Sequence, residues 1–389
     1  MTQPPLSRRH LLARAGLIGC SLAASPLLTP LTFASAPWDG RLVVIILRGG
    51  MDGLDVVRPV GDPDFAALRP TLAKGAAPLN LDGFFGLHPA LADLMPLWQR
   101  GELGFVQAVS TPYRDKRSHF DGQDLLEAGT QTLQGAPRDG WLNRMLQEMP
   151  TVTAQTAYGI GQSPLRLLDG AAEVAHWAPD AALRLSPQAL QLAELVMEKD
   201  PAMQAALAQA QLLSTTKDPS GKGGAAHLHI ARFAAQRLRG PARIAAFSIN
   251  GWDTHRAQAR SLPQGLRHLS DTIVTLKNDL GAEIWGKTAV VAITEFGRTA
   301  RENGTGGTDH GTAGAMVMAG GAIRGGRIYG QWPGLGEHDL YQGRDLMPTG
   351  DVRAPVAWIM RGLAGLSTSA LNEKVFPGLE MGSDPQILR

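Results

Sequence analysis

The chain has 389 residues, of which 44% are hydrophobic and 19% charged, a composition typical of a globular protein with a large buried core. Disordered and collagen-like chains are excluded. The formal net charge is +2, but three arginines fall within the first 36 residues, so residues 37–389 carry 34 basic and 35 acidic side chains. Because no basic run remains, we expect no nucleic-acid partner.

The first 36 residues have the anatomy of an export signal. The sequence SRRHLL at residues 7–12 resembles the twin-arginine motif, and an apolar stretch over 15–31 follows it. Residues 34–36 (ASA) match a small-residue cleavage site, with cleavage after Ala34 or Ala36. The apolar stretch is short and contains two prolines, which argues against a permanent membrane span. We predict a signal peptide over 1–36, with the twin-arginine translocase as export partner, and a periplasmic or secreted mature protein. A lipoprotein box before Cys20 is the alternative, although the apolar core ahead of it is short.

The mature chain opens with a strand pattern. Residues 41–47 (RLVVIIL) form a continuous apolar run, as in a central parallel strand buried on both faces. The glycine-rich segment after it carries Asp52, which is either a site carboxylate or an ordinary turn residue. Apolar spacing then predicts a helix over 87–100, and residues 103–109 (LGFVQAV) predict a second strand.

A helix is predicted from Ser118 to Ala128, preceded by basic residues. Ser118 is either its N-cap or a group that meets an anionic substrate, because free backbone N–H groups at a helix start favour negative charge. From about 130 to 240 the composition changes, and the segment 187–213 is rich in Ala, Leu and Gln. We therefore predict a helical insertion over about 130–240 within a single domain spanning 37–389.

Strand and helix patterns alternate in the second half of the chain. Strands are predicted over 243–249, 288–293 and 315–319, and a helix over 262–280 has leucines spaced for burial. This alternation predicts an α/β sandwich with a mostly parallel sheet.

Acidic and histidine side chains follow the predicted strands. Asp253 and His255 lie two apart, so in an extended segment both side chains reach one face and one metal; the alternative is a turn cap beside a surface histidine. Glu295 directly follows the 288–293 strand, and Arg298 comes soon after. This pair suits a metal ligand beside an anion-binding guanidinium, or a plain salt bridge.

Two further histidines complete the set. His310 lies in the glycine-rich segment GTGGTDHGTAGA, where backbone atoms allow close approach of a ligand, and His119 follows Ser118. The carboxyl ends of parallel strands converge on one edge of a sheet. The sequence therefore predicts one metal-dependent site assembled from distant parts of the chain.

Six segments resemble the family known as domain of unknown function 1501: LRGGMDGLD, GLHPAL, RSHFDGQ, GWDTH, TEFGRT and GTDHGTAGAMVMAGG. The resemblance covers nearly the whole mature chain and its leader. That family is similar to the alkaline phosphatase superfamily, which includes phosphatases and sulfatases. The resemblance implies a three-layer α/β/α sandwich with a mostly parallel central sheet and a two-metal site. It assigns the nucleophile role to Ser118 and metal-ligand roles to a larger set, namely Asp52, Asp253, His255, Glu295 and His310.

The sequence departs from the superfamily pattern at three places. Asp52 is displaced from the usual early carboxylate, the Asp253–His255 pair is tighter than usual, and Glu295-Phe296 stands where an Asp-His pair is expected. We predict an exported hydrolase of phosphate or sulfate esters that uses a divalent metal, with Zn²⁺ preferred and Mn²⁺ or Ca²⁺ as alternatives. Its substrate would be a small anionic ester held by Arg298. The alternative is a secreted binding or assembly protein that keeps the fold with a degraded metal site.

Overall fold

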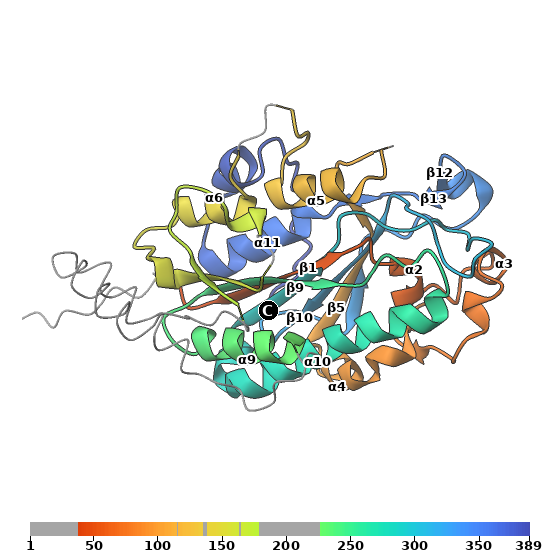
Figure 1. Ribbon diagram of the computed structural model, residues 1–389, viewed down its shortest axis with the longest axis horizontal. Coiled ribbons are helices and arrows are strands. Elements are labelled where there is room, and N and C mark those ends of the chain that lie inside the picture. The colour runs from red at the N-terminus through yellow and green to blue at the C-terminus, as the bar shows by residue number, and fades with distance from the viewer. Residues whose placement is uncertain (1–37, 115, 135–137, 163–164, 179–225) are drawn as a thin grey trace, which may run out of the picture.

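A computed structural model describes residues 38–114, 116–134, 138–162, 165–178 and 226–389, which form a three-layer α/β/α sandwich (Figure 1). The predicted signal peptide at 1–36, Cys20 and the helical segment 187–213 lie outside the described residues. Within the described part, the predicted mostly parallel sheet and sandwich architecture are confirmed.

The middle layer is a nine-stranded sheet in the order β11-β5-β10-β9-β1-β8-β6-β7, with β14 paired to β5. Its strands are β1 (Arg41–Arg48), β5 (Leu103–Ser110), β6 (Ala157–Ile160), β7 (Ala175–Trp177), β8 (Ile244–Asn250), β9 (Thr288–Ile293), β10 (Gly314–Ala319), β11 (Arg327–Tyr329) and β14 (Gly350–Asp351). The continuous apolar run at the start of the mature chain is β1, which pairs in parallel with β8 on one side and β9 on the other.

Strand β10 runs antiparallel to both of its neighbours, β9 and β5. The chain passes from β9 to β10 through a loop without a crossover helix, so it re-enters the sheet at the edge it has just left. The start of β10 therefore lies at the same edge as the carboxyl ends of β1, β8 and β9.

Alternate side chains of β1 point to opposite faces, and each face is covered by helices. Val43, Ile45 and Leu47 belong to one apolar cluster, together with side chains of α4, α9 and α10. The β1 residues between them belong to the cluster that contains side chains of α5, α6 and α11. Figure 1 shows these two helical layers on either side of the sheet. Fully burying each such side chain stabilises the fold by about 1.5–3 kcal/mol.

The helices are α2 (Gly53–Val56), α3 (Phe65–Leu68), α4 (Met95–Gln99), α5 (His119–Ala128), α6 (Trp141–Gln147), α9 (Ala226–Leu238), α10 (Gln258–Gly286) and α11 (Arg353–Ala364). Short helical turns are η1 (Leu72–Lys74), η2 (Pro89–Leu94), η3 (Ala154–Thr156), η4 (Arg166–Leu168), η5 (Glu337–Asp339) and η6 (Ala370–Val375). Outside the main sheet, β2 (Val57–Arg58), β4 (Gly86–Leu87) and β3 (Leu79–Asn80) form a three-stranded sheet, and β12 (Leu340–Tyr341) and β13 (Asp345–Leu346) form a two-stranded one.

Two regions differ in detail from the sequence expectation. The helix predicted over 87–100 is a 3₁₀ turn, η2, followed by the short α4, because prolines stand at the start of both segments. In the region 130–240, the described residues include α6 and α9, but also β6 and β7 at one end of the central sheet. Part of this region therefore extends the sheet.

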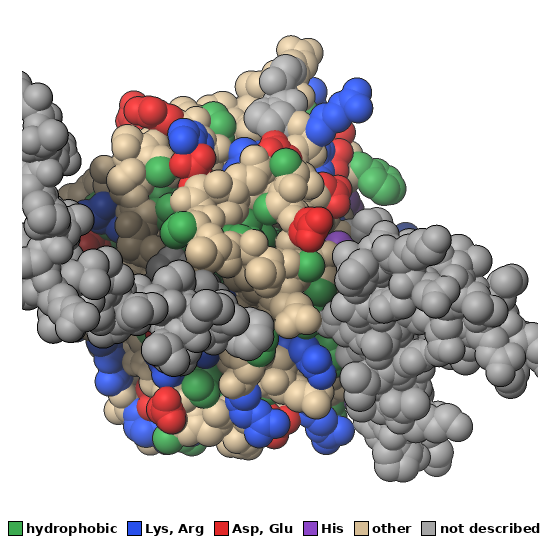
Figure 2. Space-filling view, turned by 90° about the vertical axis from the view of Figure 1, so that its left-hand side faces the viewer, with side chains coloured by type: hydrophobic (Ala, Val, Ile, Leu, Met, Phe, Trp, Pro, Cys, Tyr) green, Lys and Arg blue, Asp and Glu red, His purple; other side chains and the backbone are tan. Residues whose placement is uncertain are grey.

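Acidic and basic side chains are interspersed over the face drawn in Figure 2, in keeping with the near-zero net charge of residues 37–389. Among the residues described, no helix combines the length and apolar composition that crossing a bilayer requires.

Candidate metal centre

Four loops meet at the edge where β1, β8 and β9 end and β10 begins. The loop after β8 carries Asp253 and His255, and the loop that leads into β10 carries His310. The first residue of α5, His119, follows the chain that leaves β5 at the same edge, since Val109 of β5 pairs with Gly314 of β10. The mixed pairing of strands that are distant in the chain, parallel between β1, β8 and β9 and antiparallel at β10, thus brings these side chains together.

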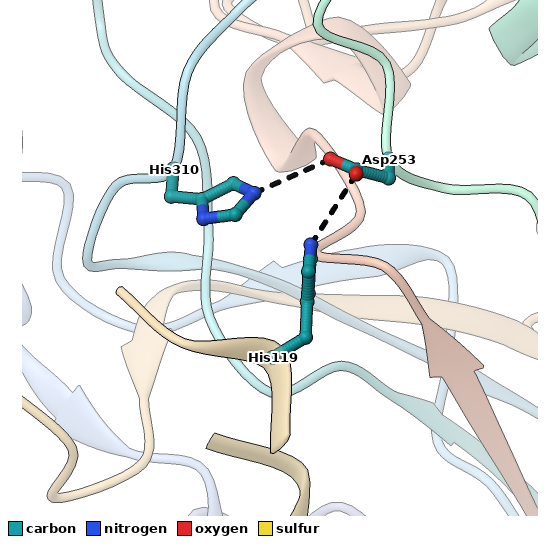
Figure 3. Close-up of side chains that lie close together, drawn as sticks. All are labelled: His119, Asp253 and His310. Atoms are coloured by element: carbon teal, nitrogen blue, oxygen red, sulfur yellow. Dashed lines mark hydrogen bonds and ion pairs between the residues drawn. The ribbon is translucent and has the colours of Figure 1, made fainter. Parts of the chain in front are cut away.

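Three imidazole nitrogens and one carboxylate share a small volume. The ligand atoms of His119, Asp253 and His310 all lie within 4.8 Å of one another (Figure 3). Nε2 of His310 lies 3.3 Å from Oδ1 of Asp253, and Nε2 of His119 lies 3.4 Å from Oδ2. Nε2 of His255 is 2.9 Å from Nε2 of His310 and 3.1 Å from Oδ1 of Asp253. His119, Asp253 and His310 are thus a candidate metal-ligand triad, and His255 contacts two of its three members.

The other nitrogen of each ring faces a hydrogen-bond acceptor. Nδ1 of His119 lies 2.7 Å from Oε1 of Glu295. Nδ1 of His255 lies 3.0 Å from Oδ1 of Asp309, and Nδ1 of His310 lies 2.8 Å from the carbonyl oxygen of Arg117. A carbonyl or ionised carboxylate only accepts, so the proton of each neutral ring belongs on Nδ1. Each Nε2 then presents a lone pair to the shared volume, as in histidines that bind metals.

A buried atom without a hydrogen bond supports the same assignment. Nε2 of His119 is inaccessible to solvent and makes no hydrogen bond to any described residue. A buried polar atom left unpaired costs about 1–3 kcal/mol, so such atoms in folded proteins usually meet an ion or water. The donor set therefore fits a divalent metal at this position.

Phe296 carries no ligand atom and instead packs behind the histidines. Its ring stacks on His119 with centroids 5.1 Å apart, and lies 4.9 Å from the ring of His310. Tyr113 stacks on Phe296 with centroids 6.2 Å apart. The aromatic group fixes the orientation of two imidazoles and makes one side of the site apolar.

Arg298 holds Asp253 in place. The guanidinium is buried and donates from Nη2 to Oδ1 of Asp253 at 2.7 Å. Its other N–H groups donate to backbone carbonyls of the surrounding loops, those of Gly49, Gly50, Trp252 and Thr308. This geometry therefore does not favour the predicted anion-binding role of Arg298, because its N–H groups already donate to Asp253 and to backbone carbonyls.

The charges of the site are strongly coupled. Partial burial raises the pKa of Asp253, but Arg298 and the neighbouring imidazoles outweigh this and lower the pKa to about 2. The hydrogen bond that His119 donates to Glu295 raises the pKa of His119, whereas burial lowers the pKa of His310. The carboxylate of Asp253 is thus ionised at any ordinary pH.

Glu295 lies behind His119, on the side away from the shared volume. Its carboxylate is fully buried and accepts hydrogen bonds from the backbone N–H of Gly49 and the side chain of Gln123, at 2.9 and 3.1 Å. Burial alone would raise its pKa, but these hydrogen bonds and that of His119 lower the pKa. The sequence predicted Glu295 as a direct ligand; the structure places it as the carboxylate that orients a ligand.

Asp52, another predicted ligand, is engaged elsewhere. Its carboxylate is buried and binds Arg69 through both oxygens, at 2.6 and 3.0 Å. It also accepts from Nε2 of Gln258 at 2.6 Å. Asp52, which is displaced in sequence from the usual early carboxylate, thus binds Arg69 and Gln258 and makes no contact with the histidines of the site.

Gln258 is the residue that sequence reasoning missed. Its buried amide donates to Asp52 and to Asp55, the latter at 2.9 Å, and accepts from the hydroxyls of Thr254 and Thr308 at 2.8 and 2.7 Å. These threonines flank the ligand residues of two loops. One amide thus joins the segment after β1 to the loops that carry Thr254 and Thr308. No sequence pattern around Gln258 indicates this role.

Ser118 caps α5. Its hydroxyl oxygen accepts from the backbone N–H of Asp121 at 3.4 Å, and its own backbone N–H donates to the hydroxyl of Tyr113 at 2.7 Å. The capping role left open by the sequence is present, and it places the hydroxyl directly before the ligand residue His119.

The family model described as "Protein of unknown function (DUF1501)" matches residues 104–356, more than half of the chain. The chain belongs to this family. Its matched region contains His119, Asp253, His255 and His310. No curated protein matches the chain.

Three solved structures illustrate the wider likeness. The chain is similar to the alkaline phosphatase of the Antarctic bacterium TAB5 (11% identity, TM-score 0.37, covering 76% of this chain and 95% of that one). It is also similar to the lipoteichoic acid synthase LtaP from Listeria monocytogenes (8% identity, TM-score 0.40, covering 90% of this chain and 78% of that one). A protein in the alkaline phosphatase superfamily from Vibrio parahaemolyticus is similar as well (11% identity, TM-score 0.36, covering 76% of this chain and 65% of that one). At these low scores, function has to be argued from the site itself.

Proposed function

We propose that this protein is an exported, metal-dependent hydrolase of phosphate or sulfate esters. The observation that carries the proposal is the convergence of three imidazole Nε2 atoms on the carboxylate of Asp253, each ring held from behind by an acceptor. In metal sites, an acceptor that binds one ring nitrogen typically fixes the tautomer and orientation of the histidine, so that the other nitrogen can bind the metal.

Zn²⁺ is the proposed metal. A set of three histidines and one carboxylate matches the nitrogen-rich coordination that Zn²⁺ prefers, and Mn²⁺ is the next choice. Ca²⁺ prefers oxygen ligands, so it fits this set poorly. When bound, the metal would polarise the ester oxygen and lower the pKa of water.

The chain's own groups would supply the remaining chemistry. Ser118 is the proposed nucleophile, with water as the alternative, because its hydroxyl adjoins His119 at the start of α5. His119, fixed by the contact of its Nδ1 with Glu295, would hold the metal beside this hydroxyl. The anion would be held by the helix start and by the exposed side chains of Lys116 and Arg117, rather than by Arg298.

Metal content tests the proposal. We expect the purified protein to carry near-stoichiometric metal that is lost in His310→Ala and His119→Ala. His338→Ala is the matched control, because His338 is exposed and lies in η5, outside the ligand set. Equal metal content in His310→Ala and in the control would refute the metal site. Metal binding without hydrolysis of 4-nitrophenyl phosphate or sulfate would instead favour a binding or assembly protein.

Export is a separate part of the proposal. The twin-arginine motif at residues 7–12 supports transport of the folded, metal-loaded protein to the periplasm. Replacing Arg8 and Arg9 together by lysine should leave the precursor in the cytoplasm. Normal processing of that variant would contradict twin-arginine export.

A further inference from the structure

A cavity of about 540 Å³ lies beside the loop that carries His310. Asp309 forms part of its wall, and the same carboxylate binds Nδ1 of the ligand His255 at 3.0 Å. Arg344 also lines it and donates to the backbone carbonyl of the ligand His310 at 3.0 Å. The cavity thus shares its wall with the loop that carries the site, and its volume is within the range of small-molecule pockets.

The wall of this cavity holds charged groups that the fold does not use. Glu302 is committed, because its carboxylate accepts from backbone N–H groups at 2.9 to 3.0 Å. In contrast, the side chains of Arg301, Asp64 and Glu337 have no hydrogen bond or ion pair with any described residue. All three are exposed, so they are available to a ligand.

The mixture of groups selects the ligand class. A purely anionic ligand would meet Asp64 and Glu337, and a purely cationic one would meet Arg301. Hydroxyl groups donate to carboxylates and accept from a guanidinium at the same time, so a neutral polyhydroxylated group satisfies both kinds of partner. Leu335 and Leu340 give the cavity an apolar side for the C–H face of such a group.

We infer that this cavity binds the polyhydroxylated, sugar-like alcohol portion of the ester whose anionic end lies at the metal centre. The inference rests on the proposed function and names the substrate class for it. Arg301 and Glu337 would act as specificity-determining residues, because they contact the alcohol and not the reacting ester.

Binding measurements separate this inference from the proposed function. The probes are a panel of hexose 1- and 6-phosphates, n-hexyl phosphate with the same anion on an apolar chain, and the free hexoses at millimolar concentration. Titration calorimetry would give affinities for the phosphates, and saturation-transfer NMR would detect the free sugars. The protein is used with its metal, as wild type and as Arg301→Met, Glu337→Gln and the control Arg239→Met. Arg239 is exposed just beyond α9, outside the cavity lining.

We expect at least one hexose phosphate to bind more tightly than n-hexyl phosphate. Arg301→Met and Glu337→Gln should each weaken that complex about tenfold, the loss expected for one hydrogen bond to a charged group, and leave n-hexyl phosphate binding unchanged. Arg239→Met should alter neither. Failure of the hexose phosphates to exceed n-hexyl phosphate, with no free-sugar signal, would overturn the inference. Equal losses for both phosphates in Arg301→Met would overturn it too. Free-sugar binding that is sensitive to Arg301→Met, without affinity for any phosphate, would support the cavity and refute the ester hydrolase.

Discussion

Replacing Gln258 tests whether one buried amide organises the metal centre. In Gln258→Leu the side chain keeps its approximate volume but loses its hydrogen bonds to two carboxylates and two threonine hydroxyls. The carboxylates of Asp52 and Asp55 retain Arg69 and Arg58 as partners, so the unpaired groups are chiefly the hydroxyls. At about 1–3 kcal/mol for each buried group left unpaired, we expect a loss of about 3–5 kcal/mol of stability.

The matched variant Gln258→Glu replaces only the amide nitrogen and so turns its two contacts with carboxylates from attractive to repulsive. The retained oxygen still accepts from both threonines, but the new oxygen faces Asp52 and Asp55 at the 2.6 and 2.9 Å now spanned by the amide nitrogen. Three carboxylates cannot all remain ionised there, so the folded state takes up a proton. Since the pKa of the introduced carboxyl is raised by folding, the variant's stability should be greatest at low pH and be lost as pH rises.

Urea unfolding, followed by far-UV circular dichroism at pH 5 and pH 8, measures both effects. A competing chelator would report metal affinity, which we expect to fall about tenfold in Gln258→Leu because two ligand loops lose their tie. The reasoning is refuted if Gln258→Leu lies within about 0.5 kcal/mol of wild type, the scatter of ordinary surface changes. It also fails if Gln258→Glu and wild type share the same pH dependence.

Three further predictions address separate contacts. Glu295→Gln should lower metal affinity about 10–100-fold while preserving the fold, as seen by chelator competition, because His119 loses its charged acceptor. Burial lowers the pKa of His88 below 6.5. The contribution of the neutral imidazole to the free energy of unfolding is therefore complete above pH 6.5 and is lost as pH falls. We expect His88→Asn to flatten the decline in thermal stability between pH 7.5 and pH 5. A Cβ on Gly297 would clash with the backbone carbonyl oxygen of Ala313, so Gly297→Ala should cost about 3 kcal/mol or more in urea unfolding. Gly304→Ala, with open space around it, should cost far less.

The sequence by itself determined the central strands and the edge at which they end. The apolar run at 41–47 could only be a buried central strand, and the strand predicted over 288–293 has those bounds in β9. Because parallel strands end at one edge, the residues that follow them converge whatever the details of packing. Asp253, His255 and His310 were therefore predicted together, and they lie together in the structure.

Only the tertiary structure decided the role of each side chain at that edge. Glu295 and Asp52 look equivalent in sequence, yet one orients His119 and the other binds Arg69. The choice depends on which donors approach from other segments, and those approaches are set by packing of side chains far apart in the chain. Arg298 illustrates the same point, since backbone carbonyls of neighbouring loops consume donors that a sequence pattern would offer to a ligand.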